Sequence, residues 1–486
     1  MNDDQLVELL TDLIENKHES ECLEFKVNNS NPQKIGEYIS AISNSAALLG
    51  EPFGFIVWGI EDGTWKVVGT DFDPAKYKVK GEDLENFLVR QLDPGLNIQF
   101  YHFLYLDQMV TILQVPPAIQ KPTSFKGTEF IRISSHKQAL KKFPEKERAL
   151  WKVFDQQKFE HLLVLSGLSS DQLLGILDYS SFFRVLKKDI PRERKDIIEQ
   201  LKSEHLIIRE PGKLYGITAL GAILFAKDLN IFDILKRKTV RIVIYKGQQR
   251  TETIREFLVH EGYASGFEKI IGYVKDNLPA REVINGSFRQ EVVPYPEITL
   301  RELIPNALIH QDLSIRGTGP MIEIFSDRIE ITNPGKPLVN ILRFIDTPPI
   351  SRNEDLASFM RRINICEERG SGVDKVITAV ECSQLPPPDF MVYENFTKSI
   401  LYGPRKFSEM TKTERIRASY QHCCLCYVNN SRMTNTTLRV RFGLELTDIS
   451  TISRIISDTV KKNFIKSEDP SSASRKHIKY VPFWVS

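Results

Sequence analysis

The sequence predicts a multi-domain chain of the α+β class. Its 486 residues exceed what one ordinary hydrophobic core holds, so three or four domains are expected. Apolar residues make up 41% and charged residues 26%, as in a globular protein. Strand-like apolar runs alternate with stretches of helical periodicity, so both kinds of element are expected. We place four domains at 1–150, 151–230, 231–404 and 405–486.

The first domain combines helices with short strands. The expected helices are Asp4–Asn16 and Pro32–Leu49, and the expected strands are 21–26, 53–60, 65–69, 109–115 and 129–134. In the first of these strands, Leu23 and Phe25 fall on one face. Glu24 and Lys26 fall together on the opposite face.

Three carboxylates accompany these strands. Glu19 and Glu24 lie five residues apart, and Asp62 follows the buried strand at 53–60. Such hard oxygen ligands can hold Mg²⁺ or Mn²⁺, which activate water for phosphodiester cleavage. The alternative is that Glu24 and Lys26 form a surface ion pair and that Asp62 caps a turn.

The second domain is expected to be a small helical unit. Leu206–Thr218 predicts a two-stranded wing before a helix over Ala219–Ala226, a winged-helix pattern. Such a unit can bind nucleic acid, act as a spacer or form a dimer contact.

The third domain is expected to be mixed α/β, with strands at Val240–Tyr245, Met321–Phe325 and Arg328–Ile331. Before the last two strands, Glu302, Asn306 and His310 stand four residues apart and share one face of a predicted helix. Pro305 is expected to kink this helix.

The C-terminal domain resembles a second winged helix. We expect a helix over Thr411–Val428, a second capped by Asn435, and a third capped by Asp448. The third helix is expected to bury one set of side chains and expose another: buried Ile449, Ile452, Ile456 and Val460; exposed Ser450, Arg454, Ser457 and Lys461. A basic wing after Ile465 closes the domain.

Charge is unevenly distributed along the chain. Residues 405–486 carry 15 Lys and Arg against 7 Asp and Glu, a net charge of +8. The chain as a whole has a net charge of +2, so the remainder carries −6. A basic segment favours contact with nucleic acid, although a solvated helical face can also produce one.

The remaining features predict a cytoplasmic protein. No apolar run approaches the length of a membrane span, the N-terminus is acidic rather than signal-like, and no membrane partner is expected. Six cysteines in so long a chain do not indicate a disulfide framework. The cluster His422–Cys426 indicates buried thiols rather than zinc, because no second ligand pair lies nearby.

Three N-terminal segments, ESECLEFK, ISAISNSAALLG and IVWGIEDGTWKVVG, resemble the AlbA-like core domain of Schlafen proteins. The resemblance implies that Glu19, Glu24 and Asp62 form a catalytic, metal-binding trio of a nuclease. It also implies that Lys26 stabilises developing charge on the phosphate. Many relatives are only nucleic-acid binders. The segment 122–135 resembles the end of the same domain, where Arg132 could meet a phosphate backbone.

The run REL..NALIHQD, I.ITNPG, RN and ERGSG is similar to divergent ATPase domains of the gyrase–histidine kinase–MutL (GHKL) superfamily. The resemblance implies that Glu302 activates water and that Asn306 holds Mg²⁺ against the phosphates of ATP. Asn333 stands where the superfamily has an aspartate for the adenine amino group. The full set implied to contact ATP is Glu302, Asn306, His310, Asp312, Asn333, Gly335, Arg352, Asn353, Gly370 and Gly372.

Together these resemblances identify the chain as similar to bacterial Schlafen-like proteins. They imply metal-dependent cleavage of RNA, such as transfer RNA, or of DNA, gated by ATP-driven dimerisation or higher oligomerisation, with a role in anti-phage defence. The expected nucleic-acid contacts are Arg132, Arg454, Lys461, Arg475 and Lys476. One alternative is an ATP-responsive DNA-binding regulator without nuclease activity. Another is an ATPase adaptor for a partner effector.

Overall fold

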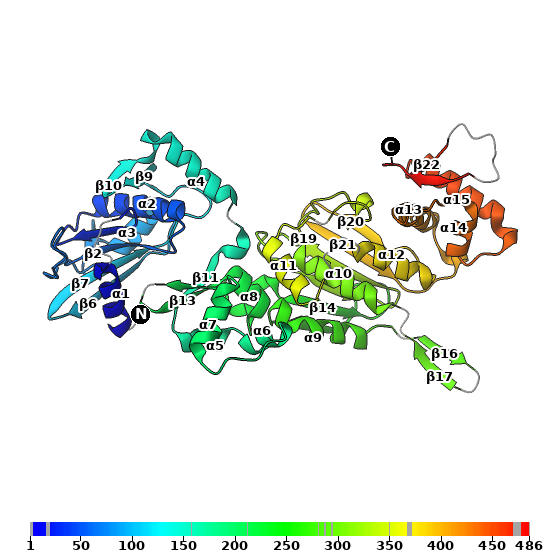
Figure 1. The fold of residues 1–486 in the computed structure, drawn as a ribbon, viewed down its shortest axis with the longest axis horizontal. Helices are drawn as coiled ribbons and strands as arrows, with labels where there is room; N and C mark the ends of the chain where they lie inside the picture. The colour runs from blue at the N-terminus through cyan, green and yellow to red at the C-terminus, as the bar shows by residue number, and fades with distance from the viewer. Residues whose placement is uncertain are drawn as a thin grey trace. The chain divides into compact units, whose positions relative to one another are not determined.

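The fold was established from a computed structural model, which describes residues 3–15, 20–156, 158–210, 212–279, 281–285, 288–292, 295–348, 350–366, 372–469 and 478–485. The chain is mixed α/β with several sheets (Figure 1). The described residues form fifteen α-helices. The chain divides into two compact units. Unit 1 comprises Met1–Leu173 and Ile207–Ile217, and unit 2 comprises Leu174–Leu206 and Thr218–Ser486. The division into four domains remains a prediction.

The main sheet of unit 1 has the strand order β1-β2-β7-β6. Its strands are β1 (Leu23–Lys26), β2 (Gly54–Trp58), β6 (Gln99–Tyr105) and β7 (Gln108–Val115). β1 runs parallel to β2, and the other pairs are antiparallel. The strand expected at 65–69 is wrong, since only an isolated bridge joins Ile60 to Val67.

A hydrophobic layer covers each face of this sheet. Leu23 and Phe25 pack with the buried leucines of α1 (Asp3–Glu15). On the other face, Ile56 and Trp58 of β2 pack with the isoleucines of α2 (Pro32–Leu49). The predicted alternation in β1 is therefore confirmed, and Glu24 points to the α2 side.

Local signals fix both ends of α2. The side chain of Asn31 accepts hydrogen bonds from the backbone N–H groups of Gln33 and Lys34, and Pro32 occupies the first helical turn. Gly50 ends the helix in the left-handed conformation with φ of 72°, which glycine adopts without steric cost. These caps explain why the predicted bounds are confirmed.

Buried polar side chains of α2 hold a second sheet of unit 1. Asn44 donates from Nδ2 to the carbonyls of Thr123 (2.9 Å) and Phe130 (2.8 Å), and its Oδ1 accepts from Thr123 N–H at 2.7 Å. Ser40 donates to the Thr123 carbonyl at 2.6 Å. The order of this sheet is β10-β9-β8-β5, with β5 Leu92–Asp93, β8 Ser124–Phe125, β9 Thr128–Ile133 and β10 His136–Ala139.

A three-stranded sheet with the order β11-β13-β12 contains the predicted hairpin. Its strands are β11 (Leu163–Leu168), β12 (Ile207–Glu210) and β13 (Leu214–Thr218). The sequence predicted the hairpin but not β11. The other helices before residue 230 are α3 Leu84–Gln91, α4 Pro144–Gln156, α5 Ser170–Ile176, α6 Tyr179–Val185, α7 Arg194–Ser203 and α8 Ala219–Phe225.

Unit 2 contains a six-stranded mixed sheet with the order β15-β14-β18-β19-β21-β20. The strands are β14 Val240–Tyr245, β15 Thr253–Val259, β18 Met321–Ile324, β19 Arg328–Pro334, β20 Asp389–Val392 and β21 Phe396–Tyr402. Helices α9 (Tyr263–Asp276), α10 (Glu297–Ile309) and α12 (Gly372–Cys382) accompany it, and α10 packs against α12 (Figure 1).

The shorter elements complete the description. They are α11 Glu354–Arg362, the hairpin strands β3 Lys78–Val79 and β4 Glu82–Asp83, the hairpin strands β16 Arg281–Asn285 and β17 Phe288–Val292, and 3₁₀ turns at Leu140–Lys142, Phe159–His161, Leu229–Ile231, Lys236–Lys238, Ile341–Arg343, Phe407–Glu409 and Leu446–Asp448.

The C-terminal helices are α13 (Lys412–Val428), α14 (Asn435–Arg441) and α15 (Ile449–Lys461), followed by an antiparallel pair, β22 (Ile465–Ser467) and β23 (Tyr480–Pro482). Thr434, not Asn435, caps α14, because its side chain accepts from Thr437 N–H. Asp448 precedes α15 without a side-chain cap hydrogen bond.

The buried face of α15 is also shifted from the expected one. Ile449 is 50% exposed and Val460 is 37% exposed, whereas Ile455 and Thr459 join Ile452 and Ile456 in the interior. The exposed set Ser450, Arg454, Ser457 and Lys461 is confirmed as exposed.

Cys423 and Cys424 are fully buried free thiols, which agrees with their predicted role in the core. In the described part of the chain, no three His, Cys, Asp or Glu side chains are grouped to hold a metal ion. No helix of that part is long and apolar enough to cross a bilayer.

The three-stranded sheet contains a buried carboxyl group, Glu210. Its Oε2 accepts from Gly167 N–H at 2.9 Å, and burial raises its pKa to about 7. The pKa of Glu210 is higher in the folded chain than in the unfolded chain. The contribution of this carboxyl group to the stability of the fold is therefore complete below about pH 4.5 and is lost as the pH rises through about 7. We expect Glu210→Gln to stabilise this sheet by about 2 kcal/mol at pH 8 and to have little effect at pH 5.

Amide hydrogen exchange of residues 163–168 and 207–218, corrected for intrinsic rates, measures this effect. Equal protection of wild type and variant at both pH values would contradict it.

Candidate functional site

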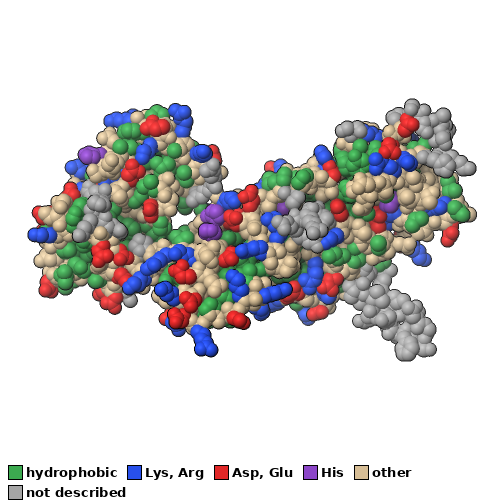
Figure 2. All heavy atoms as spheres, in the orientation of Figure 1, with side chains coloured by type: hydrophobic (Ala, Val, Ile, Leu, Met, Phe, Trp, Pro, Cys, Tyr) green, Lys and Arg blue, Asp and Glu red, His purple; other side chains and the backbone are tan. Residues whose placement is uncertain are grey.

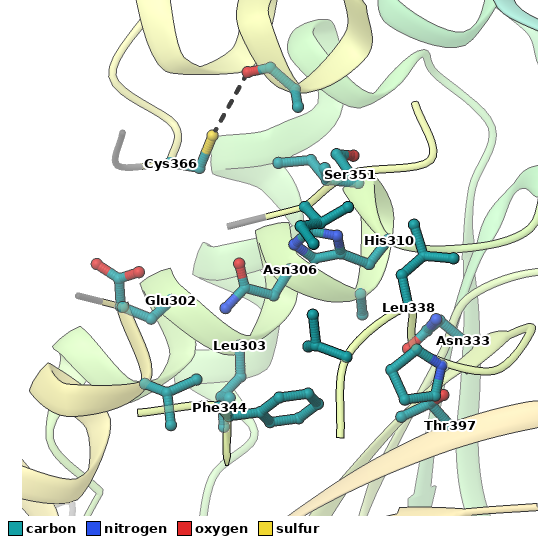
Figure 3. Close-up of a pocket in the computed structure, with 18 of the residues that line it drawn as sticks. Glu302, Leu303, Asn306, His310, Asn333, Leu338, Phe344, Ser351, Cys366 and Thr397 are labelled. Atoms are coloured by element: carbon teal, nitrogen blue, oxygen red, sulfur yellow. Dashed lines mark hydrogen bonds between the residues drawn. The ribbon is translucent and has the colours of Figure 1, made fainter. Parts of the chain in front are cut away.

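A cavity of about 180 Å³ in unit 2 is lined by one face of α10. Glu302, Asn306 and His310, spaced one helical turn apart, all contribute to its wall. Figure 3 shows the three side chains following one another along the helix. Their predicted shared face is confirmed.

The opposite face of α10 anchors the helix in the core. Leu300, Ile304 and Leu308 are almost fully buried. The helix continues past Pro305 to Ile309, so the proline does not end it. Because this face of α10 is buried, Glu302, Asn306 and His310 on the other face point toward the cavity.

The end of the cavity near His310 is formed by two paired strands. Asn333 at the end of β19 lies opposite Thr397 of β21 in the ladder, and both line the cavity (Figure 3). Asn333 donates from Nδ2 to the Pro334 carbonyl at 3.3 Å, which leaves Oδ1 as its acceptor. Leu338 lies beside Asn333 (Figure 3), and further apolar side chains line the cavity: Pro337, Val339, Phe344, Ile350 and Phe390.

The other end of the cavity is charged. Glu302 and Arg361 both act electrostatically on the thiol of Cys366, whose pKa burial raises to about 12, so the three side chains lie at one end. Arg361 forms no ion pair with any described residue. Its guanidinium is therefore available to an anionic ligand.

The start of α12 lies against the same end. A Cβ atom built on Gly372 would lie 2.6 Å from Oε2 of Glu302 and 3.7 Å from Nδ2 of Asn306. Only a residue without a side chain leaves room for both groups in their present positions.

His310 is neutral at physiological pH. Burial and, to a smaller extent, the nearby Arg352 guanidinium lower the pKa of this histidine to about 4. A neutral imidazole can accept a hydrogen bond as well as donate one. His310 therefore contributes a dipole rather than a charge to the cavity.

Three residues expected to contact ATP do not line this cavity. Asn353 is buried and donates from Nδ2 to the carbonyls of Ile309 (2.7 Å) and Gln311 (2.8 Å), so it caps α10. Asp312 accepts from Ser314 N–H at 3.0 Å. Gly335 has φ of 94° and packs against the Asp312 side chain, so it is a turn glycine.

The other expected ATP contacts divide as follows. Asn333, Arg352 and Gly372 line the cavity, and Gly370 lies outside the described residues. Sequence reasoning missed Thr397, Phe344 and Arg361. Their approach to α10 depends on strand pairing and helix packing, for which one sequence contains no local signal.

The predicted carboxylate trio of unit 1 has a different arrangement. Glu24 is only 1% exposed, and its two oxygens pair with Arg132 and Lys26. Asp62 is exposed in the turn after β2, and Glu19 lies outside the described residues. Because both oxygens of Glu24 already pair with cations, the described residues do not form a divalent-metal site.

The structure also corrects the expectations for Arg132 and Lys26. Arg132 is fully buried beside Glu24, so it does not offer a phosphate contact at the surface. The expected ion pair of Glu24 with Lys26 is present, but Glu24 is buried instead of lying at the surface. The Tyr38 ring lies 5.4 Å from Nζ of Lys26, 5.8 Å from Cζ of Arg132 and 4.7 Å from Nζ of Lys137.

The C-terminal basic residues are partly internal. Arg439 and Arg441 are buried, and Arg417 pairs with Asp389 at 2.6 Å. On the face drawn in Figure 2, Lys and Arg side chains lie among Asp and Glu side chains. The net charge therefore overstates the exposed positive surface.

Two of the expected nucleic-acid contacts remain available on α15. Arg454 and Lys461 are exposed and form no ion pair with the described residues. Arg475 and Lys476 lie outside the described part of the chain.

Comparisons with known proteins match two segments. Residues 19–141 match the family model described as "Schlafen, AlbA_2". Residues 317–401 match the model described as "Putative ATP-dependent DNA helicase recG C-terminal". These matches support a Schlafen-AlbA-like protein with a C-terminal ATPase-type domain. The second match begins after α10, so it includes Asn333 but not Glu302 or Asn306.

Among solved structures, the chain is similar to the crystal structure of the DIP2311 protein from Corynebacterium diphtheriae. The identity is 15% and the TM-score is 0.42, over 99% of this chain and 97% of that chain. No curated protein matches.

The buried pair of Glu24 and Arg132 yields a stability prediction. We expect Arg132→Met to destabilise unit 1 by about 3 kcal/mol, because it leaves a buried carboxylate without its main partner. The double variant Arg132→Met/Glu24→Leu is expected to regain most of the lost stability of unit 1, because no buried carboxylate remains unpaired. Trp58, Trp65 and Trp151 lie in this unit, so tryptophan fluorescence during urea unfolding reports the change.

The control is Lys121→Met, which removes an exposed ion pair with Asp93 and is expected to change stability by less than about 1 kcal/mol. An equal effect of Lys121→Met and Arg132→Met would contradict the role assigned to the buried pair.

Proposed function

We propose that this protein binds ATP in the cavity of unit 2 and that bound ATP controls its action on nucleic acid. The observation that carries the proposal is the convergence of Glu302, Asn306, His310 and Asn333 on one cavity. The ATPase-type match and the Schlafen AlbA match support the two halves of the proposal.

The adenine ring fits the end of the cavity near Asn333. Apolar side chains such as Leu338 and Phe344 would sandwich a flat aromatic base. Oδ1 of Asn333 would accept a hydrogen bond from the adenine amino group, because Nδ2 already donates to Pro334. The hydroxyl of Thr397 donates to the Gly335 carbonyl at 2.7 Å and holds the turn beside the base.

The phosphates fit the charged end. Arg361 would pair with phosphate oxygens, and the start of α12 would add the positive end of a helix dipole. Mg²⁺ or Mn²⁺, when bound with ATP, neutralises phosphate charge. The side-chain oxygen of Asn306 would hold the ion, and the carboxylate of Glu302 would accept the proton of an attacking water.

The part of the proposal that concerns nucleic acid depends on other elements of the chain. The Schlafen AlbA-like domain of unit 1 is the proposed binding module, with the exposed cations Arg454 and Lys461 of α15 as further phosphate contacts. The helices α13–α15 with β22 and β23 fit a winged helix, which supports this placement. We propose that the functional form is a dimer or larger homo-oligomer, as in the resembled ATPases.

Gly372 provides the most direct test of the cavity. We expect Gly372→Ala to weaken Mg·ATP binding about tenfold, since the added methyl group displaces the carboxylate of Glu302. Isothermal titration calorimetry of the full chain measures the change. Gly272→Ala is the matched control, because its added Cβ in α9 meets no atom within 4 Å.

If the wild-type protein does not bind ATP, the proposal is wrong. Equal weakening by the two glycine variants would also count against it.

Asn333 tests the placement of the base. Asn333→Asp places a carboxylate there, which accepts from the adenine amino group and repels the O6 acceptor of guanine. We expect the preference for ATP over GTP to rise about tenfold in competition binding, the value of one hydrogen bond. An unchanged ATP/GTP ratio would place the base elsewhere.

Phosphodiester cleavage is the second candidate function. It is favoured by the match to Schlafen proteins at residues 19–141, a segment that includes Glu19, Glu24 and Asp62. If the protein cleaves, we expect Glu24→Gln to reduce cleavage of labelled transfer RNA or DNA at least about a hundredfold in Mg²⁺ or Mn²⁺.

Glu82→Gln is the control, since Glu82 pairs with Arg90 at 2.6 Å away from β1. Binding of nucleic acid without cleavage by the wild type in every metal would favour the ATP-responsive regulator.

A further inference from the structure

Three chemically reactive side chains lie in a row between α12 and α13 of unit 2. The Sγ of Cys426 lies 3.5 Å from Nε2 of His422, which stands one turn earlier on α13. The other ring nitrogen, Nδ1, lies 3.0 Å from Oε2 of Glu381 near the end of α12. The order is therefore thiol, imidazole and carboxylate.

This order is the arrangement of a nucleophile, its base and the group that orients the base. Because the carboxylate of Glu381 accepts from Nδ1–H, it turns Nε2 of His422 toward the sulfur. Both ring nitrogens are thus engaged, and no metal-binding group of three side chains exists in the described part of the chain. The arrangement fits proton transfer rather than metal binding.

Electrostatics favours the protonated form of His422. Burial lowers the pKa of His422, but the hydrogen bonds with Cys426 and Glu381 outweigh it and raise the pKa to about 9. The imidazole is therefore protonated at neutral pH. A positive charge beside a sulfur atom stabilises the thiolate, which is the nucleophilic form.

Arg441 of α14 lies close to Glu381. This arginine is only 6% exposed, and its Nε lies 3.8 Å from Oε1 of Glu381. Its Nη2 donates to the Leu385 carbonyl at 3.0 Å, whereas Nε has no hydrogen-bond partner among the described atoms. A buried cation therefore lies beside the same carboxylate that accepts from His422.

The six cysteines differ in both access and environment. Cys423 and Cys424 are buried, and burial raises their pKa values. Cys382 is exposed, but no described histidine lies within hydrogen-bonding distance of its sulfur. Cys426 combines partial exposure with a protonated histidine.

We propose that Cys426 is a nucleophilic thiolate, activated by His422 and positioned through Glu381, and that it is a site of covalent modification by small electrophiles. With an alkyl iodide, the sulfur lone pair forms an S–C bond, the C–I bond breaks, and iodide leaves with the bonding pair. The proton stays on His422. Nothing in the protein is oxidised or reduced, and the site is independent of the ATP cavity.

The test is the rate of alkylation of each cysteine in the folded full chain, with iodoacetamide as the probe and peptide mass spectrometry as the readout. An ordinary thiol has a pKa of about 8.5. Below that pH, its rate of alkylation therefore falls nearly tenfold for each pH unit. The lower nucleophilicity of an acidic thiol offsets part of the gain in thiolate. We expect Cys426 to react about fivefold faster than Cys382 at pH 6.5, with a nearly flat rate from pH 6.5 to 8.

Two variants separate activation from simple exposure. His422→Gln is expected to restore the steep pH dependence of an ordinary thiol at Cys426, and Glu381→Gln to move the profile part of the way. Glu381→Gln keeps the shape of the side chain, so it remains informative if His422→Gln fails to fold. Cys382 is the internal control in every sample, with an unchanged profile.

A rate at Cys426 that falls with pH in parallel with that at Cys382 would overturn the proposal. A flat profile that survives both His422→Gln and Glu381→Gln would overturn the assigned roles of these two residues.

Discussion

The end of α10 is held by buried hydrogen bonds on which the cavity depends. A helix ends with backbone carbonyls that lack intrahelical partners, and burying them without donors is costly. Asn353 donates to the carbonyls of Ile309 and Gln311. Gln311 donates to Tyr263 Oη at 2.9 Å, and Tyr263 donates to the Lys238 carbonyl at 2.8 Å. This chain of contacts fixes the helix end, so its polar face keeps its direction toward the cavity.

Local chemistry determined which parts of the fold were predictable. The bounds of α2 follow from Asn31, Pro32 and Gly50, and β14 follows from a run of β-branched residues that only Arg241 interrupts. By contrast, β11 contains Gly167 and exposed positions, so its sequence lacks the alternating pattern of a strand. It is a strand because it pairs with β13. The cap of α14 was misplaced by one residue, since Thr434 and Asn435 are both good capping residues.

In the candidate site too, residues placed by local spacing were predictable, and residues placed by tertiary packing were not. Glu302, Asn306 and His310 were predictable because a spacing of four on a helix implies a common face. The position of Asn353 was not predictable, since only the fold brings its amide to the end of α10. Similarly, the sequence pairs Glu24 with Lys26, whereas Arg132, 108 residues later, reaches the same carboxylate only after α2 packs between the sheets.

The central claim is that ATP and nucleic acid affect each other's binding through this protein. The most direct measurement is fluorescence anisotropy of labelled transfer RNA, single-stranded DNA and duplex DNA with the full chain, with and without a non-hydrolysable ATP analogue and Mg²⁺. The account predicts a change in affinity of at least about fivefold for one of these nucleic acids, abolished by Asn306→Ala. Equal affinity with and without the nucleotide, for all three, would contradict it.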